Sequence, residues 1–567
     1  MSLAFSYDAC RSLVEDFARV VPGLLARHPR TADLALELEK LNLCDAMTRR
    51  FGVAVVGQMR VGKSTLLNAL IGRDLAPTGV NETTATVNWF RPDPHPGAPM
   101  SLAGIFRVHS RDGGEEDFPL ERIDEWLGQG ERALSARRID FFADAPFLHR
   151  VDLIDTPGLR SVIDAHQETA VAFLEERLEN ESLEQTDRAD AIIYAINPVA
   201  RETDSDMLAL FGEKTRLPGA TVWNSLAVVQ KWETLSGDDP IEEAEKKCVR
   251  QLRQLAGKVS AVIPTSGLLA RLSEKLNEPD WESIARLAGA SASTVDDLLL
   301  DAGSFLDDLP RLPISVENRI TLKEHVPWPC LQMLIKSARS RGWRDAVAVR
   351  AGARSASGLD SLRDLLERRF FALSSLIKVS GAIHKASLPC IKAMLRLREQ
   401  ADDRRSTLVD GRRLIDRLAD RVDDPDLLAA CEYIRRSLSA VESDMELAKE
   451  IQIRIERAQR DAVASFAILE GDVANLEKLD TINPGVLPPD EARRLRALFG
   501  VNGPDPAQRL GMVASSTADM ANFAENWLYE CQKLSHSAHS ALRDLYKTAC
   551  DRLEQLTNHL GKTPVSS

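Results

Sequence analysis

The spacing of apolar side chains divides the chain into three parts. From Gly52 to about Thr265, short apolar runs alternate with helical patterns, which is typical of an α/β domain with a mostly parallel sheet and helices on both faces. Residues 266–372, the rest of this part, are mainly helical in pattern. We expect strands at Val53–Val56, Thr86–Phe90, Arg150–Ile154, Ala191–Ile196, Leu226–Val229 and Ser260–Ile263.

The two flanking parts are helical in pattern. Apolar residues recur at helical spacing through residues 1–48, on both sides of a proline-containing break, which predicts two amphipathic helices whose apolar faces need a partner. Residues 373–567 carry heptad-like apolar runs, interrupted by a breaker-rich interval at 481–506. The expected architecture is therefore an α/β domain over 49–372, with helices over 1–48 before it and a long all-α region over 373–567 after it.

Composition narrows the class of protein. At 567 residues the chain is too long for a single core, and its formal net charge of −13 argues against wholesale nucleic-acid binding, so we expect no nucleic-acid partner. The eight cysteines form no CxxC pair, which favours neither a disulfide framework nor a zinc site. We find no signal peptide and no apolar run long enough to span a bilayer. We therefore expect a cytoplasmic chain whose contact with membranes is peripheral.

One segment follows the phosphate-binding pattern GxxxxGK[ST], between an apolar strand and a helix. Its glycines let backbone N–H groups approach the phosphates, Lys63 supplies a charge to the β- and γ-phosphates, and Ser64 offers a hydroxyl to Mg²⁺. The pattern in this context predicts a nucleoside triphosphate site. The predicted nucleotide-binding residues of this segment are Gly57, Gln58, Met59, Arg60, Val61, Gly62, Lys63, Ser64 and Thr65.

Two further motifs are typical of a switch that senses the γ-phosphate. Asp155-Thr-Pro-Gly158 follows an apolar strand, where Asp155 can hold Mg²⁺ through a water and the Gly158 N–H can meet the γ-phosphate. The polar segment 77–85 contains a threonine that can ligate Mg²⁺ only when the γ-phosphate is present. We assign this role to Thr84 rather than Thr83, the alternative being that both threonines only favour the next strand. The predicted metal ligands are thus Ser64, Thr84 and, through a water, Asp155.

Base recognition is expected where a later strand ends in Gln230-Lys231-Trp232-Glu233, in place of the usual [NT]KxD. Lys231 can lay its stem over the purine, and Glu233 would accept hydrogen bonds from guanine N1–H and the 2-amino group. We favour GTP because burying Glu233 unpaired opposite adenine would cost about 1–3 kcal/mol. ATP or relaxed base specificity remains the alternative. Ser266, after the next strand, is a further predicted contact to the base.

These motifs resemble those of bacterial dynamin-like GTPases. The resemblance rests on Gly57–Ser64, on Thr84, on Asp155–Gly158 and on the long helical second half. The segments Val262–Leu269, Ser357–Phe370 and Arg493–Leu510 further resemble the mycobacterial isoniazid-inducible subgroup. The resemblance implies GTP hydrolysis with Mg²⁺, a helical neck built partly from the N-terminal helices, and a helical trunk whose tip touches lipid. It also implies nucleotide-dependent dimerisation through GTPase domains and membrane remodelling.

Two positions depart from better-known GTPases. Leu159 follows Gly158 where Ras-type enzymes have a glutamine, so another group must orient the attacking water. Arg60 stands where dynamin has a small hydroxyl residue that helps to hold a monovalent cation, and it resembles the loop arginine of guanylate-binding proteins. Such an arginine, turned inward on dimerisation, can raise the rate by about 10³–10⁵. The alternative is that Arg60 points into solvent or pairs with a carboxylate. The predicted catalytic set is Arg60, Lys63, Ser64, Thr84 and Gly158.

Two functions are compatible with these features. In the first, the chain is a peripheral membrane GTPase that assembles with itself or with a related dynamin-like protein and contacts anionic lipid, for tethering, remodelling or fission. Residues 392–413 and 481–506 are the two candidates for a membrane-contacting hairpin, although such charged runs are more often solvated turns. In the second, the chain is a soluble nucleotide-dependent switch whose helices bind a protein partner.

Overall fold

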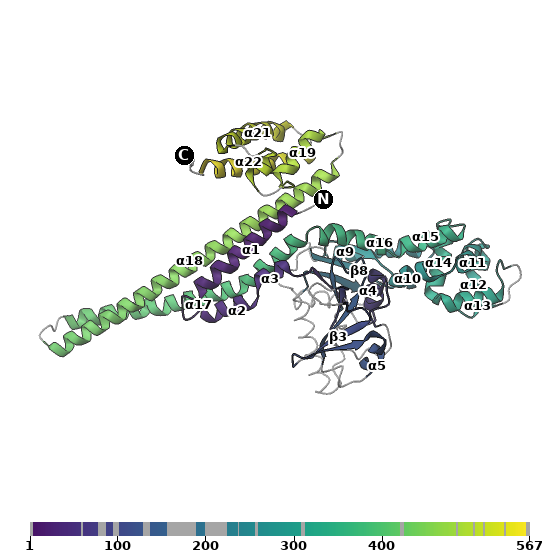
Figure 1. The fold of residues 1–567 in the computed structure, drawn as a ribbon, viewed down its shortest axis with the longest axis horizontal. Coiled ribbons are helices and arrows are strands. Elements are labelled where there is room, and N and C mark those ends of the chain that lie inside the picture. The colour runs from purple at the N-terminus through teal and green to yellow at the C-terminus, as the bar shows by residue number, and fades with distance from the viewer. Residues whose placement is uncertain are drawn as a thin grey trace. The chain divides into compact units, whose positions relative to one another are not determined.

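The computed structural model divides the chain into two compact units (Figure 1). Residues 50–377 form the sheet unit, and residues 1–49 with 378–567 form the helical unit. The residues that the structure describes are 4–57, 60–77, 87–94, 101–110, 112–128, 136–155, 189–198, 224–235, 237–255, 259–307, 312–419, 424–482, 486–502, 505–513, 516–537 and 540–562.

The described residues of the sheet unit form a nine-stranded mixed sheet with the order β4-β3-β5-β2-β6-β1-β7-β8-β9. The central strand β1 pairs in parallel with both β6 and β7, and β8 and β9 continue the parallel part. Successive residues of β1 point to opposite faces, and Val53 to Val56 are all buried, so both faces of the sheet are covered. The strands are β1 (Gly52–Gly57), β2 (Val87–Pro92), β3 (Ile105–Ser110), β4 (Glu115–Pro119), β5 (Ala136–Ala143), β6 (Asp152–Asp155), β7 (Ala191–Ile196), β8 (Ser225–Val229) and β9 (Val262–Pro264).

The expected α/β fold class is confirmed, and the six strands expected from apolar runs correspond to β1, β2, β6, β7, β8 and β9. The pattern missed β3, β4 and β5. These strands extend the sheet beyond β2, with β3 antiparallel to both β4 and β5, and β2 antiparallel to β6. The sheet is therefore parallel at its centre and largely antiparallel at one edge.

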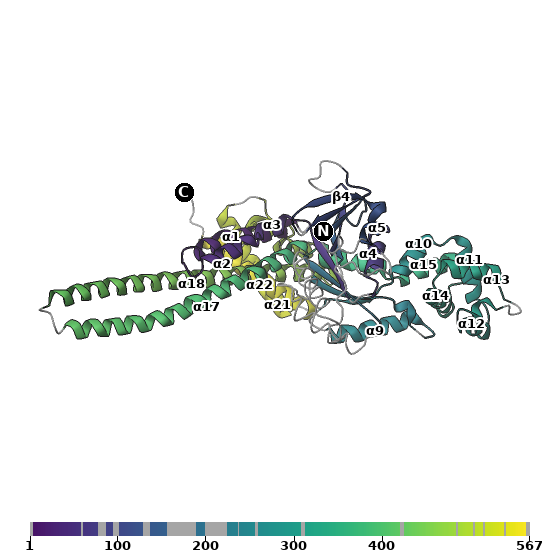
Figure 2. The ribbon, with the colours of Figure 1, turned by 90° about the horizontal axis from the view of Figure 1, so that it is seen from below.

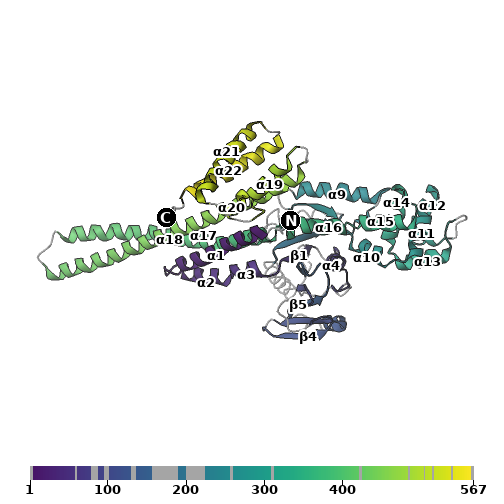
Figure 3. The same cartoon turned by 45° about the horizontal axis from the view of Figure 1, so that its top comes forward.

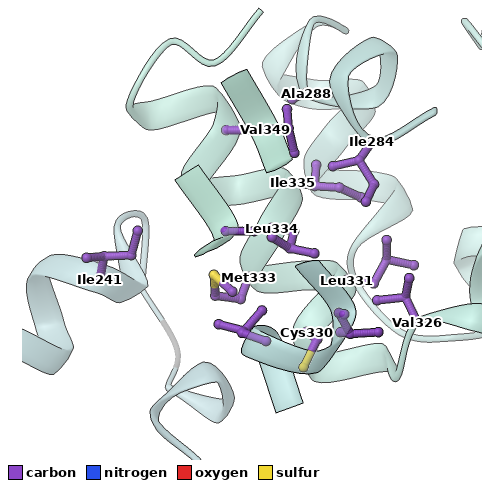
Figure 4. Packing of buried hydrophobic residues seen from close by; sticks show 14 of the residues in the cluster. Ile241, Ile284, Ala288, Val326, Cys330, Leu331, Met333, Leu334, Ile335 and Val349 are labelled. Atoms are coloured by element: carbon purple, nitrogen blue, oxygen red, sulfur yellow. The ribbon is translucent and has the colours of Figure 1, made fainter. Parts of the chain in front are cut away.

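Helices pack around this sheet. We call residues 278–356, a mainly helical segment that follows β9, the helical insert. One hydrophobic core joins this insert to β8, α9 and β9, and Figure 4 shows part of it, with side chains from α9, α11, α14 and α15. In chain order the helices of the sheet unit are α4 (Lys63–Ile71), η1 (Leu120–Arg122), α5 (Ile123–Leu127), η3 (Trp232–Thr234), α9 (Pro240–Gln254), α10 (Gly267–Lys275), α11 (Glu278–Ala288), α12 (Ala292–Leu298), η4 (Ser304–Leu306), α13 (Val316–His325), α14 (Trp328–Ser340), α15 (Ala346–Ala356), α16 (Leu359–Leu365) and η5 (Leu366–Phe371).

The helical unit is built on two long antiparallel helices, α17 (Ser374–Ala419) and α18 (Pro425–Thr481), which lie side by side in Figure 2. The N-terminal helices α1 (Ala4–Leu25), α2 (Ala32–Lys40) and α3 (Leu43–Thr48) pack along them. Ion pairs join Arg27 to Glu450 at 2.8 Å and Arg396 to Asp33 at 2.7 Å. Of the apolar positions that predicted these helices, Phe17, Leu24, Leu34 and Leu38 are buried, whereas Val20 and Leu41 are exposed.

The C-terminal helices pack on one another at the end of α18 (Figure 3). They are α19 (Pro489–Leu498), α20 (Pro506–Leu510), α21 (Thr517–Ser537) and α22 (Ser540–Lys562). Their shared core includes Trp527 and Leu553. The fully buried carboxylate of Asp472 on α18 pairs with Arg509 at 3.0 Å and with Arg552 at 2.7 Å. This paired charge fixes α20 and α22 to α18, because a buried carboxylate left without partners would be costly.

One sequence expectation about these helices is wrong. Residues 392–413 were a candidate hairpin, but they lie inside the continuous helix α17. The chain reverses instead between α17 and α18, where the Asp424 side chain accepts the Asp426 N–H and Pro425 occupies the first turn of α18. An N-cap aspartate followed by proline is a helix-start signal, so the sequence itself indicated where α18 begins.

Among the described residues, none of the helices combines the length and the apolar character that are needed to span a bilayer.

Candidate functional site

The phosphate loop joins the end of β1 to the start of α4 and depends on two glycines. A Cβ on Gly57 would lie 2.4 Å from the Ala195 carbonyl oxygen of β7, so any side chain here would displace the neighbouring strand. Gly62 has a φ of 106°, in the left-handed region that favours glycine, and it immediately precedes α4. No side chain of the described residues caps the N-terminus of α4. Its first N–H groups therefore remain available for an anion.

Lys63 lies across this loop. Its side chain is largely buried, with 9% relative exposure, and Nζ donates to the Gly57 carbonyl at 3.1 Å. The loop carbonyl thus holds the ammonium group above the first turn of α4, where an incoming phosphate would be bound. A positive charge at this end of the helix adds to the attraction of the helix dipole for an anion.

Ser64 and Asp155 meet beside the loop. The Ser64 hydroxyl donates to Asp155 Oδ2 at 3.3 Å. Burial raises the pKa of Asp155 to about 6, although the charge of Lys63 and the Ser64 hydrogen bond oppose this rise. Its second oxygen, Oδ1, is buried and has no hydrogen-bond partner among the described residues. A hard divalent cation prefers this kind of oxygen donor, so Ser64 and Asp155 fit Mg²⁺.

Lys231 joins the phosphate loop to the base-recognition segment. Its backbone has a φ of 56°, and its Nζ donates to the Arg60 carbonyl of the phosphate loop. Its Cε would lie 3.9 Å from a Cβ on Gly62. The lysine stem therefore runs along the loop while the residue stays exposed, and Arg60, whose backbone is left-handed with a φ of 59°, supplies the accepting carbonyl.

Glu233 lies in the short helix η3, directly after β8. Its side chain is buried, with 6% relative exposure, and burial raises the pKa of its carboxyl group, opposed in part by the Ser266 hydroxyl and by Lys231. Its Oε2 is buried without a hydrogen-bond partner among the described residues. A buried carboxylate with one unused oxygen is suited to accept N–H groups from a ligand.

The neighbours of Glu233 come from distant parts of the sequence. Trp232 is fully buried in the core shared with the helical insert, and α14 packs against η3. Burial, with a smaller contribution from the negative charge of Glu233, raises the pKa of the Cys330 thiol on α14. Gln230 donates through Nε2 to the Thr265 hydroxyl at 2.9 Å, which links β8 to the segment after β9. The sequence motifs did not indicate roles for Cys330 or Thr265.

The predicted residues that the structure describes lie at one edge of the sheet. Because β1, β6, β7, β8 and β9 are parallel neighbours, their carboxyl ends meet there. The residues that this arrangement brings to the same edge are Gly57, Arg60, Val61, Gly62, Lys63, Ser64, Thr65, Asp155, Lys231, Glu233 and Ser266. Four other predicted residues, Gln58, Met59, Thr84 and Gly158, lie outside the described residues.

Comparisons with known proteins match this chain to dynamins. Residues 53–222 match the model of the Dynamin family. The chain is 26% identical over 393 residues to isoniazid-induced protein IniC of Mycobacterium tuberculosis, covering 66% of this chain and 73% of IniC. It is 32% identical over 130 residues to dynamin-like protein 2 of Campylobacter jejuni, covering 23% of this chain and 20% of that protein. A solved structure of an oligomerised bacterial dynamin pair aligns with a TM-score of 0.31 and 14% identity, over 98% of this chain and 76% of that chain.

These matches confirm two expectations from the sequence. The family match spans the phosphate loop, Thr84 and Asp155–Gly158, which are the motifs that first suggested the resemblance. The match to IniC agrees with the isoniazid-inducible subgroup. The sequence resemblance to bacterial dynamin-like GTPases is therefore confirmed.

Proposed function

We propose that the chain is a dynamin-like GTPase that hydrolyses GTP with Mg²⁺ and whose nucleotide state controls its self-association at a membrane surface. The proposal of nucleotide binding rests on two buried carboxylates, one on either side of the phosphate loop. Asp155 and Glu233 each keep one buried oxygen without a partner among the described residues. Leaving such oxygens unpaired is costly, so each is explained best by a ligand that supplies a cation or an N–H group.

On the phosphate side, we assign Ser64, Thr84 and Asp155 to Mg²⁺, with Asp155 acting through a water. Bound Mg²⁺ would neutralise charge on the β- and γ-phosphate oxygens. Lys63 then binds the β- and γ-phosphates directly, and the Gly158 N–H meets the γ-phosphate. The first N–H groups of α4 complete an anion site that requires no further side chain.

We assign Arg60 as an internal arginine finger for the transferring phosphoryl group. The Lys231 ammonium group donates to the Arg60 carbonyl, which fixes the backbone of the loop at this residue. In this proposal the Arg60 side chain turns toward the γ-phosphate when two GTPase domains associate. Such a donor acts mainly on the transition state, because the extra negative charge develops there.

On the base side, the unpartnered oxygen of Glu233 favours guanine. Guanine offers N1–H and a 2-amino group to a carboxylate, whereas adenine offers neither at the same edge. Lys231 supports the purine face, and Ser266 keeps Glu233 in place through its hydroxyl. Preference for GTP over ATP is expected to be about 10- to 200-fold, which corresponds to about 1–3 kcal/mol.

Membrane contact is proposed at the tip formed by the facing ends of α17 and α18. Exposed apolar side chains gather there, namely Val409, Leu414, Leu428 and Tyr433. Tyr433 is 74% exposed, and an aromatic ring with a polar end is suited to the interface of a bilayer. The exposed Arg417 would add attraction to anionic headgroups, at about 1 kcal/mol, whereas the exposed Arg413 is paired with Asp410. The alternative is a soluble switch whose tip binds a protein.

Two measurements test the proposal. Titration of GTP and ATP, with and without Mg²⁺, should show Mg²⁺-dependent binding that favours GTP; equal binding of both nucleotides would reject the guanine assignment. Flotation with anionic vesicles should recover the protein, more strongly with a non-hydrolysable GTP analogue, and light scattering should report assembly under the same conditions.

The tip has a matched control. The double variant Leu414→Asp and Tyr433→Asp should abolish flotation, whereas Ile453→Asp, at a 54% exposed position in the middle of α18, should not. Wild-type protein that fails to float in every nucleotide state would instead favour the soluble switch.

A further inference from the structure

The turn between α15 and α16 lies directly against the base loop, which we define as residues 264–267. Gly358 in this turn has a φ of 68°, and a Cβ built on it would lie 2.0 Å from the Pro264 carbonyl oxygen. Contacts this short do not occur between real atoms, so only glycine allows the turn to approach the base loop this closely. Any other residue at position 358 would push Pro264 away.

A hydrogen bond fixes the same two segments together. The Ser266 N–H donates to the Ser357 carbonyl at 2.8 Å, and both residues are almost completely buried. The Ser357 hydroxyl donates to the Arg354 carbonyl and accepts the Leu359 N–H, so the turn itself is held rigidly. The backbone of Ser266 therefore takes its position from the turn, and Ser266 in turn interacts with Glu233.

The other end of α16 holds the helix of the phosphate loop. Arg363 donates through Nη2 to the carbonyls of Ala69 at 3.1 Å and Leu70 at 3.2 Å, in the last turn of α4. These carbonyls have no partner within their own helix, and a cation is favourable at a helix C-terminus. Arg363 therefore joins α16 to α4 in a way that an uncharged side chain would not.

The base loop also touches α4 directly. A Cβ on Gly267 would lie 2.7 Å from the Thr65 carbonyl oxygen, so the start of α10 is pressed against the first turn of α4. The segment that reads the base and the helix that binds the phosphates are thus in contact with each other, and α16 contacts both of them.

We propose that α16 is a clamp that positions the guanine site, with Gly358 and Arg363 as positioning residues. The clamp holds Ser266, and through it Glu233, at a fixed distance from the phosphate loop, so that one nucleotide can contact Glu233 and the phosphate loop at the same time. Displacing α16 would then weaken recognition of the base without removing any group that touches the phosphates. The inference rests on the proposed binding of GTP by Glu233.

The test compares two glycine variants. Gly358→Ala should raise the dissociation constant for GTP about tenfold or more, because a shift of about 1 Å in a positioned group can have an effect of up to about 10². Gly342→Ala is the matched control. Gly342 lies in the helical insert and has a φ of 70°, but no atom lies within 4 Å of its added Cβ, so it carries a similar backbone strain without moving a neighbour.

The kinetic constants for GTP distinguish a loss of positioning from a general loss of folded protein. For Gly358→Ala, the KM for GTP should rise while kcat at saturating GTP stays within about threefold of wild type. The ratio of GTP to inosine triphosphate affinity should fall toward one, because inosine lacks the 2-amino group that Glu233 accepts. If Gly342→Ala and Gly358→Ala changed the KM for GTP equally, the positioning role of α16 would be rejected.

Arg363 provides a second and independent variant. Arg363→Met should raise the KM for GTP, and Arg363→Lys should restore part of the affinity because the ammonium group can reach one carbonyl. The control is Arg339→Met, which removes a 2.7 Å bond to the Ala290 carbonyl elsewhere in the insert. An Arg363→Met protein with wild-type KM would reject this role. Wild-type protein without preference for GTP over ATP would instead reject the guanine site itself, so the two failures can be told apart.

Discussion

The two halves of the proposed nucleotide site, the phosphate half and the base half, are built in different ways. The phosphate half is one short segment, residues 57–65, together with Asp155 from the adjacent strand β6. The base half is assembled from residues 230–233, the base loop 264–267, the turn at 357–358 and Cys330 of the helical insert. The phosphate half can therefore be recognised from local sequence, whereas the base half depends on contacts between segments that are far apart in the chain. Variants in the two halves should fail differently.

The largest expected effect lies in the phosphate half. Lys63→Ala should lower affinity for GTP and GDP by about 10³ or more, since it removes the charge that meets the β- and γ-phosphates. Isothermal titration would measure this, and thermal unfolding without nucleotide would check that the variant is folded. Wild-type affinity in the variant would contradict the assignment of the phosphate loop.

A variant of Arg60 tests whether the phosphate half contributes to the rate of GTP hydrolysis. Arg60→Ala should leave GTP affinity within a few-fold and lower kcat by about 10² or more, because the guanidinium group acts on the transition state. Turnover per molecule of wild type should rise with protein concentration and depend little on potassium. Concentration-independent, potassium-stimulated hydrolysis that survives Arg60→Ala would favour a cation-assisted site with Arg60 at the surface.

Glu233 is the corresponding test of the base half. Glu233→Ala should lower GTP affinity by about 10- to 100-fold and reduce the preference for GTP over ATP, because the acceptor for guanine is lost. Binding of inorganic triphosphate should not change, since the phosphate half is intact. A variant that keeps full guanine preference would show that the base is read by other groups.

The same comparison explains what could be predicted from the sequence. Strands β1, β2, β6, β7, β8 and β9 were predicted because each contains a short apolar run, which in β1, β6 and β8 is buried on both faces, and the phosphate loop was found because its spacing is local. β4 is Glu-Glu-Asp-Phe-Pro and largely exposed, so no apolar run marked it. The approach of Gly358 to Pro264 and the packing of α14 against η3 arise only from tertiary structure, which no local pattern in this chain indicates.

The pH dependence follows from Asp155 of the phosphate half. Its pKa is raised to about 6 from an ordinary value of 3.8, so below pH 6 the carboxyl becomes protonated and Mg²⁺-dependent GTP affinity should fall, by up to about tenfold per pH unit. Stability without nucleotide should change in the opposite sense. Between pH 3.8 and about 6 the folded state binds the extra proton, so this group lowers stability as pH rises through that window. Asp155→Asn should remove both trends, and unchanged trends in that variant would assign them to another group.

The smallest effect is expected from Thr265, which supports the base half without touching the nucleotide. Thr265 is fully buried, and its hydroxyl accepts the Gln230 side-chain N–H at 2.9 Å. Thr265→Val keeps the shape but leaves the buried amide of Gln230 without this acceptor, which should lower the free energy of unfolding by about 1–3 kcal/mol. GTP affinity should fall only a few-fold, since Glu233 and Lys231 remain in place.

A double-mutant cycle attributes this effect to the hydrogen bond. Gln230→Met removes the donor, so adding Thr265→Val to it should cost less than Thr265→Val alone, with a coupling free energy of about 0.5–1.5 kcal/mol. Thr321→Val, in the exposed first turns of α13, is the control and should change stability by less than about 0.5 kcal/mol. Strict additivity in the cycle would mean that Thr265 stabilises the base half by packing alone. The base loop would then be held mainly by the turn at Ser357 and Gly358, which increases the importance of α16 for guanine recognition.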